Sequence, residues 1–158
     1  MSTATALAIV LLALVGFNLA VRAWRSRRRS LASRLDAAEP ELRRREGVSA
    51  RIFVDKTLRG GPKSGGFNQD NATVVLSAQR LIVASQWGRV LTITHDRPGD
   101  LRWVGPGRMV IEGQHPSGRA QTRVELILSD VDEWLDACGS LPGARVVRPA
   151  AGARPGAS

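Results

Sequence analysis

The chain has 158 residues, with 23 basic and 14 acidic side chains and a formal net charge of +9. Its single cysteine excludes an internal disulfide, which fits a reducing compartment. Nucleic-acid binding would use a positive charge, but no helix-turn-helix, RNA-recognition or zinc-finger pattern occurs, and basic residues after position 47 are interleaved with acidic ones. We therefore expect no nucleic-acid partner.

Residues 4–24 are predicted to form a transmembrane helix. No charged side chain occurs before Arg22, and Trp24 ends the run as an interfacial aromatic residue. An α-helix needs about 20 apolar residues to cross the hydrocarbon core, and this run is just long enough. Five basic residues follow closely: Arg22, Arg25, Arg27, Arg28 and Arg29.

The positions of these arginines predict the topology. Lys and Arg stay preferentially on the cytoplasmic side of a membrane, and here every nearby one follows the span. Residues 1–3 are therefore expected outside, and the C-terminal body in the cytoplasm, held by one span in the inner or plasma membrane of the cell. The five arginines are expected to contact anionic lipids of the inner leaflet. Only two basic residues are lysines, which indicates GC-rich bacterial coding.

A cleaved secretory signal is the alternative for the N-terminal run. Such a signal carries its positive charge before the apolar stretch, whereas here the charge comes after it. Arg22 also stands where a cleavage site needs a small residue. The pattern favours an uncleaved anchor.

Residues 25–47 are predicted to be a basic juxtamembrane neck. Its few large apolar residues are too few to pack a core. Helix is expected to continue to about Ala38, to break at Pro40 and to resume over residues 41–46. A mostly helical neck would hold the following domain roughly 20–30 Å from the bilayer.

Residues 48–141 are predicted to be one domain. Short β-like runs recur at roughly ten-residue spacing, which is typical of an antiparallel barrel or sandwich. The seven predicted strands are Val48–Val54, Thr73–Leu76, Leu81–Ala84, Val90–Thr94, Leu101–Val104, Met109–Glu112 and Thr122–Leu128.

The apolar period then changes to that of a helix. Four residues at i, i+3, i+4 and i+7 form one apolar face. These predicted core residues are Val131, Trp134, Leu135 and Cys138. Residues 142–158 are rich in Ala, Arg, Gly and Pro and are predicted to be a disordered tail.

Seven strands followed by one amphipathic helix resemble the pleckstrin homology (PH) superfold. The run VVLSAQRLIVA, from Val74 to Ala84, is similar to the hydrophobic-x-Leu-Thr-x-x-Arg-Leu-Ile run of bacterial PH-like and GRAM-like domains, with Ser77 in the Thr place. The resemblance implies a mainly β, seven-stranded antiparallel barrel or sandwich closed by the C-terminal α-helix. It also implies a binding or scaffolding role without catalysis. Arg80 is interpreted as a turn residue whose aliphatic stem covers the barrel wall.

The resemblance also suggests a binding loop. PH domains that bind phosphoinositides carry basic residues between their first two strands, which grip headgroup phosphates. Here that stretch holds Lys56, Arg59 and Lys63, but a second closely spaced basic pair is missing. A solvated loop is the alternative. Trp87, in a predicted hairpin turn, would contact a membrane or a partner if exposed, or pack over the barrel rim.

No catalytic, metal or cofactor site is expected. His95 and His115 have no Cys or carboxylate pair at metal-ligand spacing. Lys63-Ser64 resembles the end of a phosphate-binding loop, but Pro62 replaces its glycine and a predicted strand follows instead of a helix.

The sequence therefore predicts a membrane-tethered cytoplasmic PH-like binding or scaffolding module that is not an enzyme. Its partner would be a protein or anionic lipid. The alternative is a structural accessory subunit of a larger membrane complex, docked through its span or neck. The sequence specifies neither a ligand nor an oligomeric state.

Overall fold

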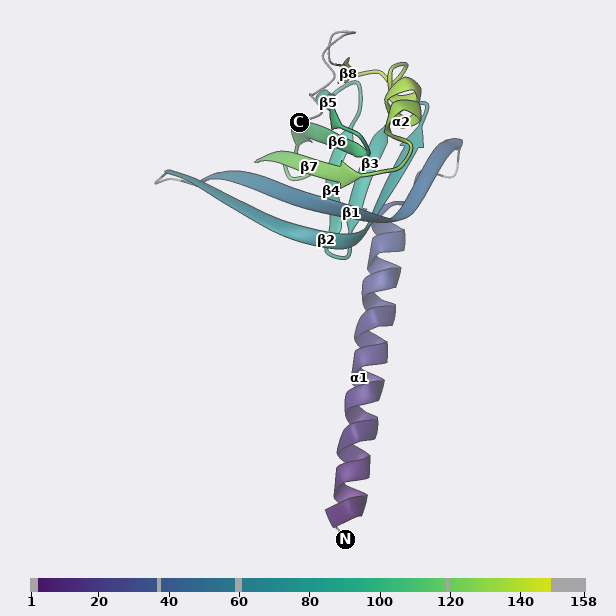
Figure 1. Cartoon of the computed structure of the whole chain (residues 1–158), viewed down its shortest axis with the longest axis vertical. Helices are drawn as coiled ribbons and strands as arrows, with labels where there is room; N and C mark the ends of the chain where they lie inside the picture. The colour runs from purple at the N-terminus through teal and green to yellow at the C-terminus, as the bar shows by residue number, and fades with distance from the viewer. Residues whose placement is uncertain (1–2, 37, 59–60, 119, 149–158) are drawn as a thin grey trace, which may run out of the picture.

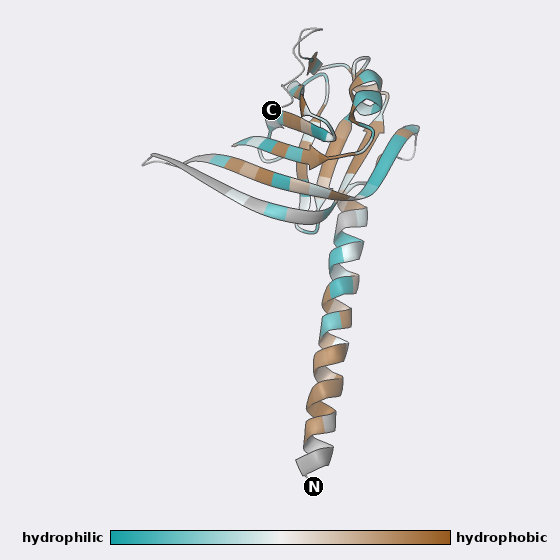
Figure 2. Ribbon diagram, viewed as in Figure 1, coloured by the Kyte–Doolittle hydropathy of each residue, from teal (hydrophilic) through white to brown (hydrophobic). Residues whose placement is uncertain are grey.

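The computed structural model describes residues 3–36, 38–58, 61–118 and 120–148. One long N-terminal helix, α1 (Thr3–Ala32), leads to a mainly β domain (Figure 1). The apolar residues of α1 occupy its N-terminal part, and polar residues begin where it approaches the domain (Figure 2). The stretch Ile9–Ala32 is long and apolar enough to cross a membrane, by length and composition. Its large apolar side chains are exposed, as Leu12 and Phe17 illustrate.

The domain is built on one eight-stranded sheet that is not closed. Its strands are β1 (Glu41–Leu58), β2 (Gly61–Ser77), β3 (Leu81–Ser85), β4 (Gly88–Ile93), β5 (Gly99–Gly105), β6 (Arg108–Gln114), β7 (Gln121–Ile127) and β8 (Ala144–Val147). They lie in the order β4-β3-β2-β1-β7-β6-β5-β8, and all neighbours are antiparallel except β5 and β8. The mainly β domain is confirmed, but instead of the predicted seven-stranded antiparallel barrel or sandwich it has an open, mixed, eight-stranded sheet with β4 and β8 at its edges.

Strand β8 lies within the stretch predicted to be a disordered tail. The chain turns at Gly143, where φ is +84°. A Cβ there would lie 2.1 Å from the carbonyl oxygen of Thr94, so only glycine fits. Ala144–Val147 then pairs with the first four residues of β5, and Val146 packs against the core. The prediction failed at these residues because composition alone does not reveal a short parallel edge strand.

Strand β1 begins at Glu41, inside the predicted neck, rather than at Val48. Its first residues pair with the end of β2, with Arg43 opposite Leu76 and Arg45 opposite Val74. The expected return to helix over residues 41–46 is therefore wrong. Pairing against a buried strand outweighs the helix propensity of Glu and Arg. Only residues 33–40 separate the helix from the sheet.

The β1–β2 hairpin joins the two halves of the sheet. On the side of β1 away from β2, Ser49–Asp55 pairs with β7. The register of the hairpin shifts on both sides of Val48, where Gly47 and Asn71 have φ of +72° and +82°. Beyond Asp55 the hairpin extends past the other strands (Figure 1).

The main core lies between the sheet and helix α2 (Val131–Cys138). The helix buries Val131, Trp134, Leu135 and Cys138. Arg43 of β1 lies over the Trp134 ring, with its guanidinium carbon 5.2 Å from the ring centroid. Its Nη2 also pairs with Asp130 Oδ2 at 3.1 Å and with Glu133. Arg43 thus holds the start of α2 against the sheet.

A second, smaller apolar cluster lies on the opposite face of β2 and β3. Val75, Ile82 and Ala84 are fully buried there beneath Ala32 and Leu35, at and just after the end of α1. Both faces of β3 are consequently covered, which explains why all five of its residues are buried. This cluster positions the end of α1 on the sheet.

Candidate functional site

The residues predicted to bind lipid or a partner lie in two separate places. Lys56 and Lys63 are cross-strand partners near the end of the β1–β2 hairpin, which extends away from α1 (Figure 1). Arg59 lies outside the described residues. Trp87 lies instead in the turn between β3 and β4, beside α1. Trp87 therefore does not form one site with Lys56 and Lys63.

Trp87 is paired with one of the juxtamembrane arginines. The guanidinium carbon of Arg25 lies 5.6 Å from the centroid of the Trp87 ring, within cation–π range. Trp87 is 55% exposed, so packing on the edge of the sheet covers only part of it. Its backbone amide donates a hydrogen bond to Ser85 Oγ at 3.1 Å, which fixes the turn.

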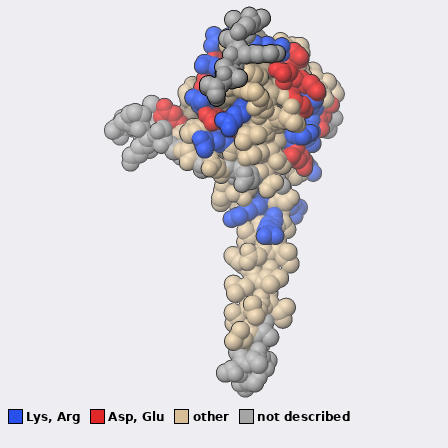
Figure 3. Space-filling model, in the orientation of Figure 1, with Lys and Arg blue, Asp and Glu red and all other residues tan. Residues whose placement is uncertain are grey.

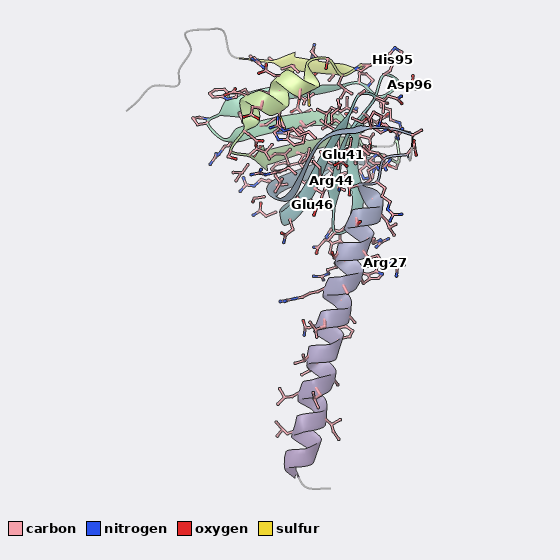
Figure 4. All side chains as sticks on the ribbon, turned by 90° about the vertical axis from the view of Figure 1, so that its right-hand side faces the viewer. Arg27, Glu41, Arg44, Glu46, His95 and Asp96 are labelled. Atoms are coloured by element: carbon pink, nitrogen blue, oxygen red, sulfur yellow. The ribbon has the colours of Figure 1, made fainter. Side chains whose placement is uncertain are left out.

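The juxtamembrane arginines lie on the part of α1 just below the domain, where basic side chains project from the visible face of the helix (Figure 3). Exposed side chains are those of Arg22, Arg25, Arg27 and Arg28. The side chain of Arg29 lies outside the described ones. With 3.6 residues per turn these positions are distributed around the helix, and Arg27 points away from its axis (Figure 4). Arg28 lies over the Trp24 ring at 5.0 Å, and none of the four exposed arginines is ion-paired with a described carboxylate.

The segment between α1 and β1 is held by a buried ion pair. The Glu39 side chain is 4% exposed, and its Oε2 lies 2.8 Å from Nη2 of Arg80. Nε of Arg80 donates to the other carboxylate oxygen at 3.1 Å, and Ser77 Oγ donates to the same oxygen. Arg80 also reaches Asp36 Oδ2 at 2.7 Å. Arg80 is thus a turn residue, as interpreted from the sequence, and it also forms ion pairs with Glu39 and Asp36.

Two further arginines bind the end of α1. Arg89 of β4 donates from Nε to the carbonyl of Ala32 at 3.0 Å and from Nη2 to that of Arg34 at 3.3 Å. A cation there complements the unpaired carbonyls at a helix C-terminus. Arg44 Nη1 donates to Ser33 Oγ at 3.3 Å.

Arg44 is itself held in place by two carboxylates. It lies between Glu41 and Glu46 (Figure 4) and pairs with both, at 2.8 and 3.2 Å. The hydrogen bond to Glu41 is the main reason that the pKa of Arg44 is raised. Arg44, Arg80 and Arg89 thus join the helix firmly to the sheet.

The sequence did not predict that Glu39, Arg80 and Arg89 hold the end of α1 and the following segment on the sheet. The usable signals were the Ser77-x-x-Arg80 turn and a Glu-Pro pair just before a strand. Neither signal shows that Glu39 and Arg80 contact each other, because the two residues are 41 positions apart in the sequence.

The other chemically notable side chains do not form a reactive arrangement. Burial raises the pKa of the Cys138 thiol to about 12, which keeps it protonated and unreactive. His95 and Asp96 are exposed neighbours at the end of the domain far from α1 (Figure 4). No group of three or more His, Cys, Asp or Glu residues suited to a metal occurs in the described part of the chain.

A groove of about 460 Å³ is lined by residues of β1, β2, β5, β6 and β7. Three arginines and one glutamate line it, and of these only Arg123 and Glu125 are ion-paired with each other among the described residues. Arg123 Nη2 lies 2.9 Å from Glu125 Oε1, and Arg51 Nε donates to Asn68 Oδ1 at 3.0 Å. The juxtamembrane arginines are the denser cluster, since four exposed arginines without a described carboxylate partner lie within seven residues, and they are the stronger candidate for binding an anionic ligand.

No protein-family model matches the sequence of this chain, and no curated protein matches it. The PH-like resemblance therefore depends on the run around Ser77–Arg80 and on the order of strands and helix.

Proposed function

We propose that this chain is a single-pass membrane protein in which α1 anchors a PH-like binding or scaffolding domain at the cytoplasmic face of the cell membrane. The proposal is supported by the contacts that hold the end of α1 and residues 33–40 on the sheet, which we call the helix–sheet joint. The helix runs unbroken from its apolar part to Ala32, and Arg44, Arg80 and Arg89 tie its end and the following segment to the sheet. An anchor attached in this way presents the domain at a fixed distance and angle, which suits a binding or scaffolding role.

The domain lies closer to the bilayer than a helical neck would allow. From Trp24, the last residue of the proposed span, to Ala32 an α-helix advances only about 12 Å. The end of α1 is already packed against Ala84 and its neighbours at that point. The domain surface around α1 is therefore held at the level of the lipid headgroups, where anionic lipid or a membrane-bound protein would be its partner.

The orientation follows from the charges beside the span. Four exposed arginines lie on the domain side of the apolar stretch, and no basic residue precedes it. Basic flanks remain in the cytoplasm, so the domain is cytoplasmic and residues 1–3 are outside.

The order of the elements supports a PH-like fold. Strands β1 to β4 are consecutive neighbours, β5 to β7 are consecutive neighbours, and α2 follows with Trp134 fully buried. The Ser77–Arg80 run forms the turn between β2 and β3, where the amide of Ser77 donates to the carbonyl of Arg80 at 2.9 Å. Strand β8 is an addition to this pattern.

Reporter fusions test the proposed anchor and orientation. A reporter that is active only in the cytoplasm should be active after Ser158, and one that is active only outside should be silent there. Replacing Arg22, Arg25, Arg27 and Arg28 by Gln should mix the two orientations, whereas removing Arg102, Arg123, Arg145 and Arg148 should not. Recovery of the full chain in the soluble fraction, or activity of the external reporter, would contradict the proposal.

Co-purification in mild detergent separates this function from that of an accessory subunit. A stoichiometric partner that is lost when residues 4–24 are replaced by an unrelated span would favour the accessory role. A partner retained by the exchanged chain would support a binding domain.

A further inference from the structure

The β3–β4 turn lies at the level where the apolar part of α1 ends. Arg25 directly follows Trp24 on the helix, and successive residues of an α-helix are about 1.5 Å apart along its axis. Because the Arg25 guanidinium lies over the Trp87 ring, the ring lies within one arginine side chain of that level. Two Trp–Arg pairs, Trp24 with Arg28 and Trp87 with Arg25, therefore lie near the same depth.

We propose that the β3–β4 turn is a second membrane-contact site, in which the Trp87 indole and the Arg25 guanidinium bind the anionic phospholipid headgroups of the leaflet next to the domain. This inference rests on the proposed function, because it requires α1 to span the bilayer. It goes further by assigning a lipid contact to the folded domain itself.

The chemistry of the pair suits a headgroup. Tryptophan prefers the membrane interface, since its ring is apolar and its N–H is polar. A guanidinium over an aromatic face keeps its N–H groups, which lie in its own plane, free to donate to a phosphate. Arg25 is not paired with a described carboxylate, and Trp87 is more exposed than any other described tryptophan.

Contacts within the protein alone hold the β3–β4 turn beside α1, so the site does not need lipid to form. Arg89, two positions after Trp87, is hydrogen-bonded to the carbonyls of Ala32 and Arg34. The turn therefore cannot move away from α1 without breaking these bonds. A preorganised contact loses little conformational entropy on binding.

The charge around the turn selects the class of lipid. Arg22, Arg25, Arg27 and Arg28 present four positive charges with no described carboxylate paired to them. Such a cluster prefers anionic over zwitterionic lipid. With contacts at both Trp24 and Trp87, the domain is fixed against tilting and rotating relative to the leaflet.

Fluorescence quenching of the full chain in nanodiscs tests this contact. The discs contain phosphatidylcholine and phosphatidylglycerol, with or without a lipid that bears a nitroxide on its headgroup. The difference between wild type and Trp87→Phe isolates the emission of Trp87, and Trp24→Phe isolates that of Trp24. We expect the nitroxide to remove most of the emission of both residues, and we expect iodide in the buffer to quench Trp87 weakly.

The two tryptophans distinguish failure of this contact from failure of the anchor. Quenching of Trp24 without quenching of Trp87 would overturn the lipid contact while leaving the anchor intact. Absence of quenching at both would overturn the anchor as well.

The lipid class is tested in the same system. Because the anchor fixes the depth of Trp87, the readout is which lipid lies beside it: we expect nitroxide-labelled phosphatidylglycerol to quench Trp87 more than nitroxide-labelled phosphatidylcholine, and Arg25→Gln to reduce this difference. The control Arg148→Gln removes one charge elsewhere on the domain, at a residue paired with Asp136, and should leave the quenching unchanged. Equal quenching of Trp87 by the two labelled lipids would overturn the assignment to anionic headgroups, and an equal loss of the difference in Arg25→Gln and Arg148→Gln would show that only net charge is sensed.

Discussion

The Glu39 carboxylate and the Arg80 guanidinium form an ion pair that links the segment after α1 to the turn between β2 and β3. Both oxygens of Glu39 lie within 3.1 Å of Arg80 nitrogens, and the Glu39 side chain is almost completely buried. Burial makes such a pair sensitive to the loss of either partner, because an unpaired charge would remain in a poorly solvated place. The pair therefore couples the stability of the domain to the position of α1.

Replacing Arg80 by Leu should destabilise the domain. The Glu39 carboxylate would remain buried without its cation, which we expect to cost about 2–3 kcal/mol of the free energy of unfolding. Denaturant unfolding of the full chain in detergent, followed by tryptophan fluorescence, would measure the loss. Asp36→Asn is the matched control, since Asp36 is 77% exposed and its contact with Arg80 is an ordinary surface pair. Equal effects of the two substitutions would contradict the importance of the buried contact.

The true start of the domain can be tested by truncation. A chain that begins at Arg25 keeps Glu39, Arg43 and all of β1, and it should fold cooperatively into a β-rich domain. A chain that begins at Val48 loses the pairing of residues 41–45 with β2 and the contacts of Arg43 with α2. Its free energy of unfolding should be lower by on the order of 5 kcal/mol, which is comparable to the whole stability of a small domain. Circular dichroism during thermal unfolding compares the two, and equal midpoints would mean that residues 25–47 are only a neck.

Trp134 should be the most costly aromatic residue to truncate. It is fully buried, and Trp134→Ala should cost about 3–5 kcal/mol through the cavity it leaves. Trp87→Ala, at a half-exposed position, should cost less than about 1 kcal/mol. Urea midpoints of both variants measure the difference, and similar values would argue against α2 as an essential part of the core.

Much of this architecture follows local patterns in the sequence. The helical period of Val131, Trp134, Leu135 and Cys138 corresponds to the buried face of α2. The predicted strands between Leu81 and Leu128 overlap β3 to β7 because turn residues separate them. The apolar run before Arg22 corresponds to the exposed part of α1.

Features that depend on distant partners could not be predicted in this way. Residues 41–46 are mostly charged, and they form a strand only because β2 supplies a buried edge. Strand β8 needs β5 and the glycine turn at Gly143. The helix–sheet joint depends on contacts of Arg80 and Arg89 with the end of α1 and the segment after it. A local pattern of charge does not indicate which carboxylate or carbonyl an arginine contacts.

Cys138 should be inert in the folded chain. Burial raises the pKa of its thiol to about 12, so almost no thiolate exists at pH 8. A thiol reagent such as a maleimide should label it only when the domain unfolds, and the labelling rate should rise with denaturant in step with unfolding. Rapid labelling in buffer, at the rate of a free cysteine, would contradict its place in the core.

The same raised pKa predicts a loss of stability in alkali. Below about pH 8.5 the Cys138 thiol is protonated in both the folded and the unfolded chain, so it contributes no pH dependence. Above that value the unfolded chain releases the proton while the folded chain retains it, and stability falls by up to about 1.4 kcal/mol for each pH unit until the folded pKa is reached. Few other groups titrate in this range, because the chain has no Tyr and only two Lys residues. Urea midpoints between pH 8 and 10.5 should therefore fall for the wild type and stay nearly level for Cys138→Ala. Parallel curves for the two proteins would show that Cys138 is solvated in the folded state.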